Sequence, residues 1–96
     1  MGHARAEDLD GLERVLKGLR ELDGLVERRR GVFCRGTAPF VHFHVFSGEP
    51  FGDLKVDKGE WLRYPVGTVA EQRVLVADAR RVLRGGTTGL RGMAQS

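Results

Sequence analysis

The sequence has few of the features that mark a secreted or membrane protein. It holds a single cysteine, Cys34, so no internal disulfide can form, and this agrees with a reducing compartment. Its uncharged runs are far shorter than the roughly 20 residues of a membrane-spanning helix. Residues 1–10 carry acids where a signal peptide would need an apolar stretch. We therefore expect a cytoplasmic protein with no membrane partner.

The excess of positive over negative charge is also small. The formal net charge is only +3, and the whole excess lies in residues 68–96, which hold five basic and two acidic side chains. Three of the basic residues, Arg80, Arg81 and Arg84, fall in the last turns of an expected helix, where cations complement the helix dipole. So small and local an excess attracts nucleic acid weakly, and a nucleic-acid-binding module is only a further alternative.

Catalytic motifs are missing as well. The sequence has no glycine-rich phosphate loop, no nucleophile elbow, and no serine or cysteine placed near a histidine with a third orienting group. These absences favour a binding protein over an enzyme, and they predict no cofactor.

What the sequence does contain is an amphipathic segment near each end. A chain of 96 residues forms one domain with a single modest core. In the first segment, leucines and Val15 recur at helical spacing, which predicts a helix over residues 7–22 with Gly24 as its C-cap.

A second helix is predicted to begin at Thr68 and Glu71, which have the spacing of a capping box. Two consecutive glycines, Gly85 and Gly86, are expected to end it. The domain is therefore expected to cover residues 1–86, followed by a disordered tail over residues 87–96. The predicted apolar stripe of this helix is Val69, Gln72, Val76, Ala79 and Leu83.

Residues 31–67, between the two helices, predict four short antiparallel strands. Their turns are expected at residues 36–39, 47–50 and 58–60. Counting outward from these loops pairs Phe46 with Phe51, His44 with Asp53, and Lys55 with Arg63. The expected fold is α+β: a four-stranded antiparallel meander flanked in sequence by an N-terminal and a C-terminal helix, both packed on one face.

The two faces of the predicted sheet differ in chemistry. The face expected under the helices is apolar: Val32, Cys34, Val41, Phe43, Val45, Leu54, Val56, Leu62 and Tyr64. The opposite face, here called the open face, is aromatic and charged: Phe33, Arg35, Phe40, His42, His44, Phe46, Phe51, Asp53, Lys55, Trp61 and Arg63. Two helices can cover only one side of such a sheet, so the open face is the predicted binding or interface site.

Two occupants of the open face fit its chemistry. So many exposed aromatic side chains usually mark a contact surface, which favours self-association, most simply as a homodimer. In addition, Lys55 and Arg63 stand beside His42 without a matching acid, which favours an anionic small molecule. The expected function is therefore that of a small binding or interaction protein.

His42 and His44 raise the alternative of a divalent metal site. Residues i and i+2 of a strand project to the same side, and imidazole is a common ligand of zinc, copper and iron. A third ligand could come from Asp53 or from Glu49 in the adjoining turn. Because a contact between His44 and Asp53 accounts for both residues without a metal, the prediction is that none is tightly bound.

Two resemblances involve the same segment. The pattern Gly36-x5-His42-x-His44-x4-Glu49 resembles the first motif of the cupin metalloproteins, which implies His42, His44 and Glu49 as ligands. A cupin barrel, however, needs many more strands than residues 31–67 can form.

The second resemblance covers residues 25–76. The stretches Phe40-Val-His-Phe-His44, Gly52-Asp-Leu-Lys-Val56 and Trp61-Leu-Arg-Tyr-Pro-Val66 resemble a group of small uncharacterised bacterial proteins. This resemblance implies a shared fold and a bacterial origin, and it brings no activity with it.

Overall fold

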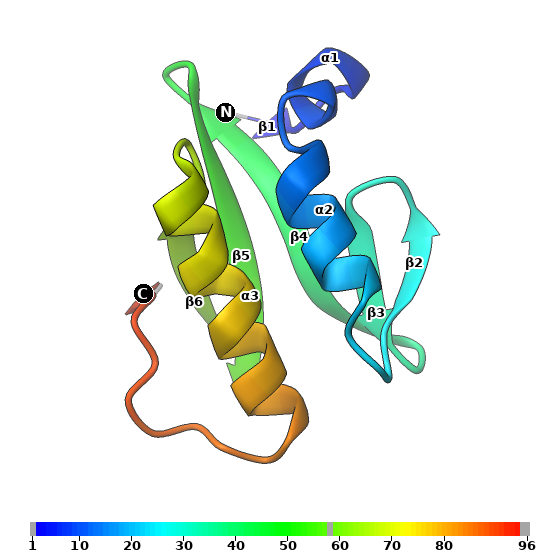
Figure 1. The fold of residues 1–96 in the computed structure, drawn as a ribbon, viewed down its shortest axis with the longest axis vertical. Helices are drawn as coiled ribbons and strands as arrows, with labels where there is room; N and C mark the ends of the chain where they lie inside the picture. Colours follow the sequence, from blue (N-terminus) through cyan, green and yellow to red (C-terminus); the bar gives the residue numbers. More distant parts are fainter. Residues whose placement is uncertain (1, 58, 95–96) are drawn as a thin grey trace.

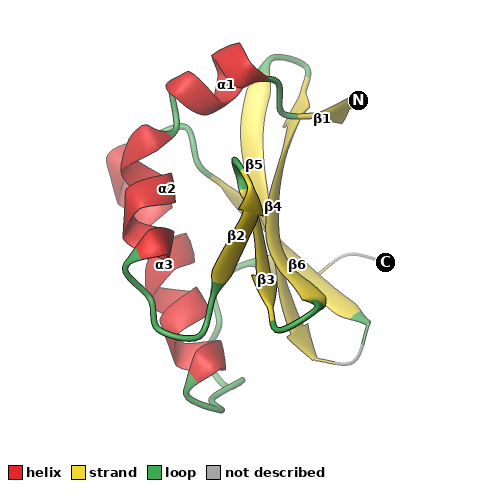
Figure 2. Ribbon diagram, turned by 90° about the vertical axis from the view of Figure 1, so that its right-hand side faces the viewer, coloured by secondary structure: helices red, strands yellow, loops and turns green. Residues whose placement is uncertain are grey.

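The computed structural model describes residues 2–57 and 59–94, which form an antiparallel sheet with helices on one face (Figures 1 and 2). The helices are α1 (Ala6–Asp10), α2 (Glu13–Arg20) and α3 (Val69–Leu83). The strands are β1 (Gly2–His3), β2 (Val26–Arg29), β3 (Val32–Arg35), β4 (Ala38–Phe46), β5 (Glu49–Asp57), β6 (Glu60–Pro65) and β7 (Met93–Ala94). The predicted α+β class, with helices before and after the main strands, is confirmed. In the described part of the chain, no helix is both long enough and apolar enough to cross a membrane.

The sheet is wider than the predicted four-stranded meander. Six strands follow one another in the order β2-β3-β4-β5-β6-β7, and β1 pairs with β4 where β3 has ended. The segment that forms β2 is short and mostly charged, so it gives no alternating apolar signal. The two-residue strands β1 and β7 are too short to show any periodicity. The prediction of four strands was wrong for these reasons.

The helix predicted over residues 7–22 is in fact two helices. α1 and α2 are separated by a turn at Gly11 and Leu12. The break falls at glycine, which costs roughly 1 kcal/mol in a helix interior relative to alanine. Leu9 and Leu16 are both buried in the core, so the apolar spacing still identified the face that packs on the sheet.

The β4–β5 turn is tighter than predicted. Ser47 and Gly48 form a two-residue hairpin loop in which both have positive φ, 51° and 80°. As a result Phe46 pairs with Glu49 and not with Phe51.

The β5–β6 hairpin shows a similar shift. Lys55 pairs with Trp61, whereas the sequence predicted a partner two residues further on, Arg63. Side chains alternate with a period of two along a strand, so an error of two residues leaves every side chain on its predicted face. Apart from Phe40, the predicted open-face residues of β4, β5 and β6 therefore lie on that face although the pairs are different.

A β-bulge places two phenylalanines on the opposite face of the sheet from the one predicted. Phe33 pairs with Val41 while Cys34 pairs with Pro39, so Phe40 is an extra residue in β4. Phe33 and Phe40 were expected on the open face, but they are 1% and 3% exposed and belong to the hydrophobic core. Cys34 is buried as well, outside that core cluster.

The ends of α3 lie where the sequence placed them. The Thr68 hydroxyl accepts a hydrogen bond from the Glu71 N–H (3.1 Å), and the Glu71 carboxylate accepts one from the Thr68 N–H (3.0 Å). Gly85, with φ of 92°, ends the helix. The capping box predicted from the sequence is confirmed.

The buried face of α3 differs from the predicted stripe. Leu75, Ala79 and Val82 are buried in the core. Val69 and Val76, which were expected there, lie to the side, and Val69 is 41% exposed. The helix has apolar residues on two sides, so the spacing alone did not decide which side faces the sheet.

Residues 87–94, the described part of the segment expected to be a disordered tail, return along the sheet so that β7 pairs with β6 (Figure 1). A buried carboxylate holds this segment. Asp78, 4% exposed, accepts hydrogen bonds from the Tyr64 hydroxyl and from the Arg91 N–H, both at 2.7 Å. Asp78 thereby ties α3, β6 and the returning segment together. Residues 95–96 lie outside the described part of the chain.

Candidate metal centre

All three histidines of the chain meet on the open face, the side of the sheet turned away from α2 and α3 (Figure 2). His42 and His44 project from β4, two residues apart and therefore on the same side. β1 places His3 directly opposite His44. One ring nitrogen from each residue lies within 4.8 Å of the others. The pairing of β1 with β4 therefore completes a three-imidazole cluster.

The rings of the cluster are in mutual contact. The centroids of His42 and His44 lie 4.6 Å apart in an edge-to-face arrangement, and those of His3 and His44 lie 4.9 Å apart. Trp61 packs against the cluster, with its ring centroid 4.6 Å from that of His42. An indole at this position gives the site an apolar wall and a built-in optical reporter.

A buried carboxylate supports the cluster. Asp53, 4% exposed, accepts hydrogen bonds from Nε and Nη2 of Arg63 at 2.9 and 3.1 Å, and this bonding raises the pKa of Arg63. Nε2 of His44 lies 3.2 Å from Oδ2 of the same carboxylate. A carboxylate placed beside an imidazole in this way commonly orients histidine ligands of zinc.

His42 has a buried ring nitrogen that is not satisfied by protein groups. Its Nδ1 has no hydrogen-bond partner among residues 2–57 and 59–94. An unpaired buried polar atom costs about 1–3 kcal/mol, a cost that a bound ligand or metal ion could remove. Burial, and next the nearby His44, lower the pKa of His42 below its usual value of 6.5. His42 is therefore neutral at pH 7, which is the form that binds metals.

Three imidazoles can occupy three corners of a tetrahedral metal site. Zinc binds histidine nitrogen at about 2.0–2.1 Å, so its ligand nitrogens lie about 3.4 Å apart. Nitrogens within 4.8 Å of one another need only a small contraction to reach that spacing. His3 is exposed and stands on a two-residue strand, so it is the ligand that can move inward most easily. The fourth corner would be left for water or an anion.

Four other predicted site residues lie near the cluster. Phe51 pairs directly with His44, and the Phe46 ring lies 5.7 Å from that of Phe51. The Arg63 guanidinium stacks over Phe46, with Cζ 4.4 Å from the ring centroid. Phe46, Phe51 and Trp61 are each half-buried; Phe46 and Phe51 pack on each other, and Trp61 packs on His42.

The remaining predicted site residues lie elsewhere. Arg35 and Lys55 line a separate hollow of about 270 Å³ at the other end of the sheet. Glu49, an alternative metal ligand in the sequence analysis, pairs with Phe46 and is not part of the histidine cluster.

His3 was not predicted as a ligand; the third ligands predicted from the sequence were Asp53 and Glu49. A two-residue strand leaves no periodic signal, so the pairing of β1 with β4 could not be anticipated from spacing. One signal did exist: with two of the three histidines on one face, His3 was the sole imidazole left to complete a site.

Comparisons with protein families, with curated proteins and with solved structures found no match for this chain. The two resemblances drawn from the sequence therefore rest on the quoted residues alone.

Proposed function

We propose that this protein binds a divalent transition-metal ion through His3, His42 and His44. The observation that carries the proposal is the convergence of all three histidines beside a buried carboxylate on one sheet face. Imidazole ligands suit zinc, copper and nickel, and a carboxylate behind one imidazole is the usual support of a zinc-bound histidine. Zinc is therefore the first candidate.

Untagged protein is expected to bind one zinc ion per chain at pH 7.5, measured by titration calorimetry and by elemental analysis after dialysis. The ligands must be deprotonated, so binding is expected to weaken as the pH falls below about 6. Because its pKa is lowered, His42 remains available to metal below pH 6.5. Copper(II) offers a second readout, since it should quench the fluorescence of Trp61, which packs against His42. Protein that stays free of metal after dialysis against excess zinc would contradict the proposal.

Replacing Asp53 by alanine is expected to weaken zinc binding about 10- to 100-fold, because His44 loses the carboxylate that orients it. The free energy of unfolding should fall by about 1–2 kcal/mol, since Arg63 is partly exposed and can rehydrate. Calorimetry and urea unfolding measure the two effects. Asp23→Ala, a change at an exposed aspartate, is the matched control and should leave both unchanged. An unaltered zinc affinity in Asp53→Ala would remove Asp53 from the site.

Self-association through the same face, the function that the sequence favoured, has less support. With Phe33 and Phe40 in the core, the aromatic area left on the open face is smaller than predicted. The rings of Phe46 and Phe51 also pack on each other, so less apolar surface remains for a partner to bury. Metal binding is therefore the better-supported function of this face.

A further inference from the structure

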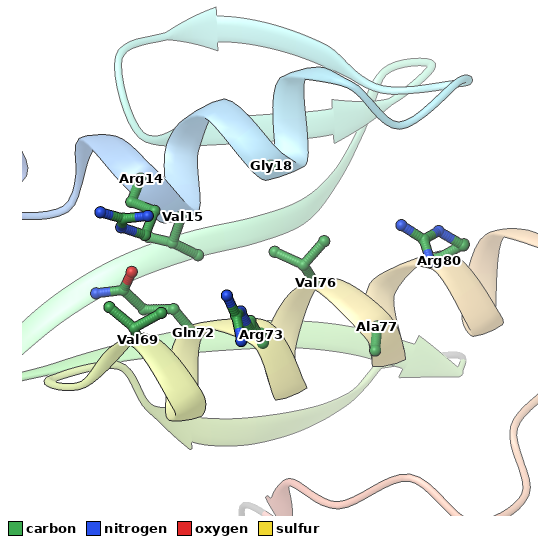
Figure 3. Close-up of a pocket in the computed structure, with 9 residues that line it drawn as sticks. All are labelled: Arg14, Val15, Gly18, Val69, Gln72, Arg73, Val76, Ala77 and Arg80. Atoms are coloured by element: carbon green, nitrogen blue, oxygen red, sulfur yellow. The ribbon is translucent and has the colours of Figure 1, made fainter.

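The helix layer contains a groove on the side of the molecule that the metal centre does not use. α2 and α3 lie side by side and run in the same direction (Figures 1 and 3). A hollow of about 360 Å³ opens between them. Arg14 lies on its α2 side, and Arg73 and Arg80 lie on its α3 side (Figure 3). Val15 and Val76 give the groove an apolar floor.

The apolar surface in the groove is distinct from the core-facing surface of α3. Leu75 and Val82 are buried in the core, whereas Val69 and Val76 line the groove. Val69 is 41% exposed, one of the few large apolar side chains so exposed among the described residues. A helix that is apolar on two sides normally packs against something on both.

The three arginines of the groove have no acidic partner in the part of the chain that the structure describes. Within residues 2–57 and 59–94, none of Arg14, Arg73 and Arg80 forms an ion pair. The described residues that line the groove include no aspartate or glutamate. The groove therefore combines an apolar floor with three cations whose charge no acid among the described residues neutralises.

The acidic residues of the two helices are all engaged elsewhere. The one acid of α2, Glu13, binds Arg20 at 3.0 Å and Arg30 at 2.6 Å. In α3, Glu71 caps the helix, and Asp78 is buried on the core side. No rotation of these side chains would supply the groove with an acid without breaking a contact that stabilises the fold.

A buried side-chain amide beside the groove also lacks one hydrogen-bond partner among the described residues. Gln72, 7% exposed, donates from Nε2 to the Val66 carbonyl at 2.9 Å, which sets the orientation of the amide. Its Oε1 has no hydrogen-bond partner in the described part of the chain. A docked segment that carries an N–H or O–H donor would satisfy it.

The spacing of the arginines indicates the shape of the occupant. Arg73 and Arg80 are two helical turns apart, about 10 Å along α3. A single small anion does not match that separation, whereas acids at positions i and i+7 of a helix do. Apolar residues between those acids would meet Val69 and Val76, as in helix-in-groove recognition.

We propose that the groove between α2 and α3 docks an acidic amphipathic helix of a partner protein. Its apolar face covers Val69 and Val76, and its flanking carboxylates pair with Arg73 and Arg80 on one side and with Arg14 on the other. This site is separate from the histidine cluster, so its occupancy does not depend on the metal.

The probe is a fluorescently labelled synthetic helix of about 18 residues, with leucine and alanine on one face and glutamate along both flanks. Anisotropy titration is expected to give micromolar affinity that weakens as salt is raised. Arg73→Gln combined with Arg80→Gln should weaken binding at least about tenfold. The control combines Arg29→Gln with Arg35→Gln, which removes the same charge from exposed residues of β2 and β3 and should change affinity less than about threefold. Adding EDTA should change neither result.

Four outcomes would overturn the proposal. The first is affinity weaker than about 1 mM. The second is a lack of specificity, which would indicate general electrostatic or apolar attraction. It would be seen as equal affinity for a peptide with glutamine in place of every glutamate, or as an equal loss of affinity in both double variants. The third is tighter binding of oligothymidine that is lost in the Arg73/Arg80 variant, which would indicate a nucleic-acid site. The fourth is a dimer in light scattering that the same variant abolishes, which would indicate a second copy of this chain.

Discussion

Replacing any one of the three histidines by glutamine is expected to weaken zinc binding by about 100-fold or more. Loss of a supporting residue behind a ligand already costs about 10- to 100-fold, and loss of the ligand itself should cost at least as much. Glutamine keeps a polar side chain of similar size, so the sheet should remain folded. Calorimetry with zinc and quenching of Trp61 by copper(II) measure the effect independently.

The three variants also differ in a way that tests the geometry. His3 is exposed at the edge of the cluster, so His3→Gln should leave the free energy of unfolding within about 0.5 kcal/mol of the native value. Glu49→Gln is the matched control, because Glu49 is the other ligand that the sequence suggested and it lies outside the cluster. If Glu49→Gln lost zinc while His3→Gln kept it, the ligand set proposed here would be refuted in favour of His42, His44 and Glu49.

Asp78→Ala is expected to lower the free energy of unfolding by about 3 kcal/mol. The change removes the acceptor of two hydrogen bonds, from the Tyr64 hydroxyl and the Arg91 N–H. Hydrogen bonds to an ionised group contribute about 1.5–3 kcal/mol each, and the Tyr64 side chain, 1% exposed, would be left with a buried donor. Urea unfolding measures the loss. Hydrogen exchange should show faster exchange in β7, because the segment that leads to it is no longer held.

Two further variants separate this network from simple loss of packing. Asp78→Asn keeps an oxygen acceptor and should cost less than Asp78→Ala. Tyr64→Phe removes only the hydroxyl, and a double-mutant cycle with Asp78→Ala should give a coupling energy of about 1 kcal/mol or more. A coupling energy near zero would mean that the contact between Tyr64 and Asp78 does not stabilise the fold.

The strand faces could be predicted well although the strand pairs could not. The predicted β4–β5 and β5–β6 registers were each wrong by two residues, because turn chemistry located the loops without fixing their lengths. His42, His44 and Asp53 nevertheless lie on the same face, as expected. The period of two makes the face insensitive to an even error in register.

The bulge in β4, in contrast, does change the face on which side chains lie. Phe40 is an extra residue in β4, so it interrupts the alternation of side chains between the two faces where β4 pairs with β3. Phe33 and Phe40, which were assigned to the open face, therefore pack in the core. A bulge of this kind is stabilised by how well the side chains fill the space under the helices. The local pattern of apolar and polar residues did not predict it.

The sequence by itself determined that the chain is α+β, that a capping box starts α3, and that His42 and His44 share a face. Each of these follows from a repeat or a spacing within one short segment. Only the tertiary structure decided that His3 joins them and that Val69 and Val76 line a groove rather than the core. His3 reaches His44 through a two-residue strand pairing across about 40 residues of chain, and α3 is oriented by packing on the sheet; neither contact leaves a trace in local periodicity.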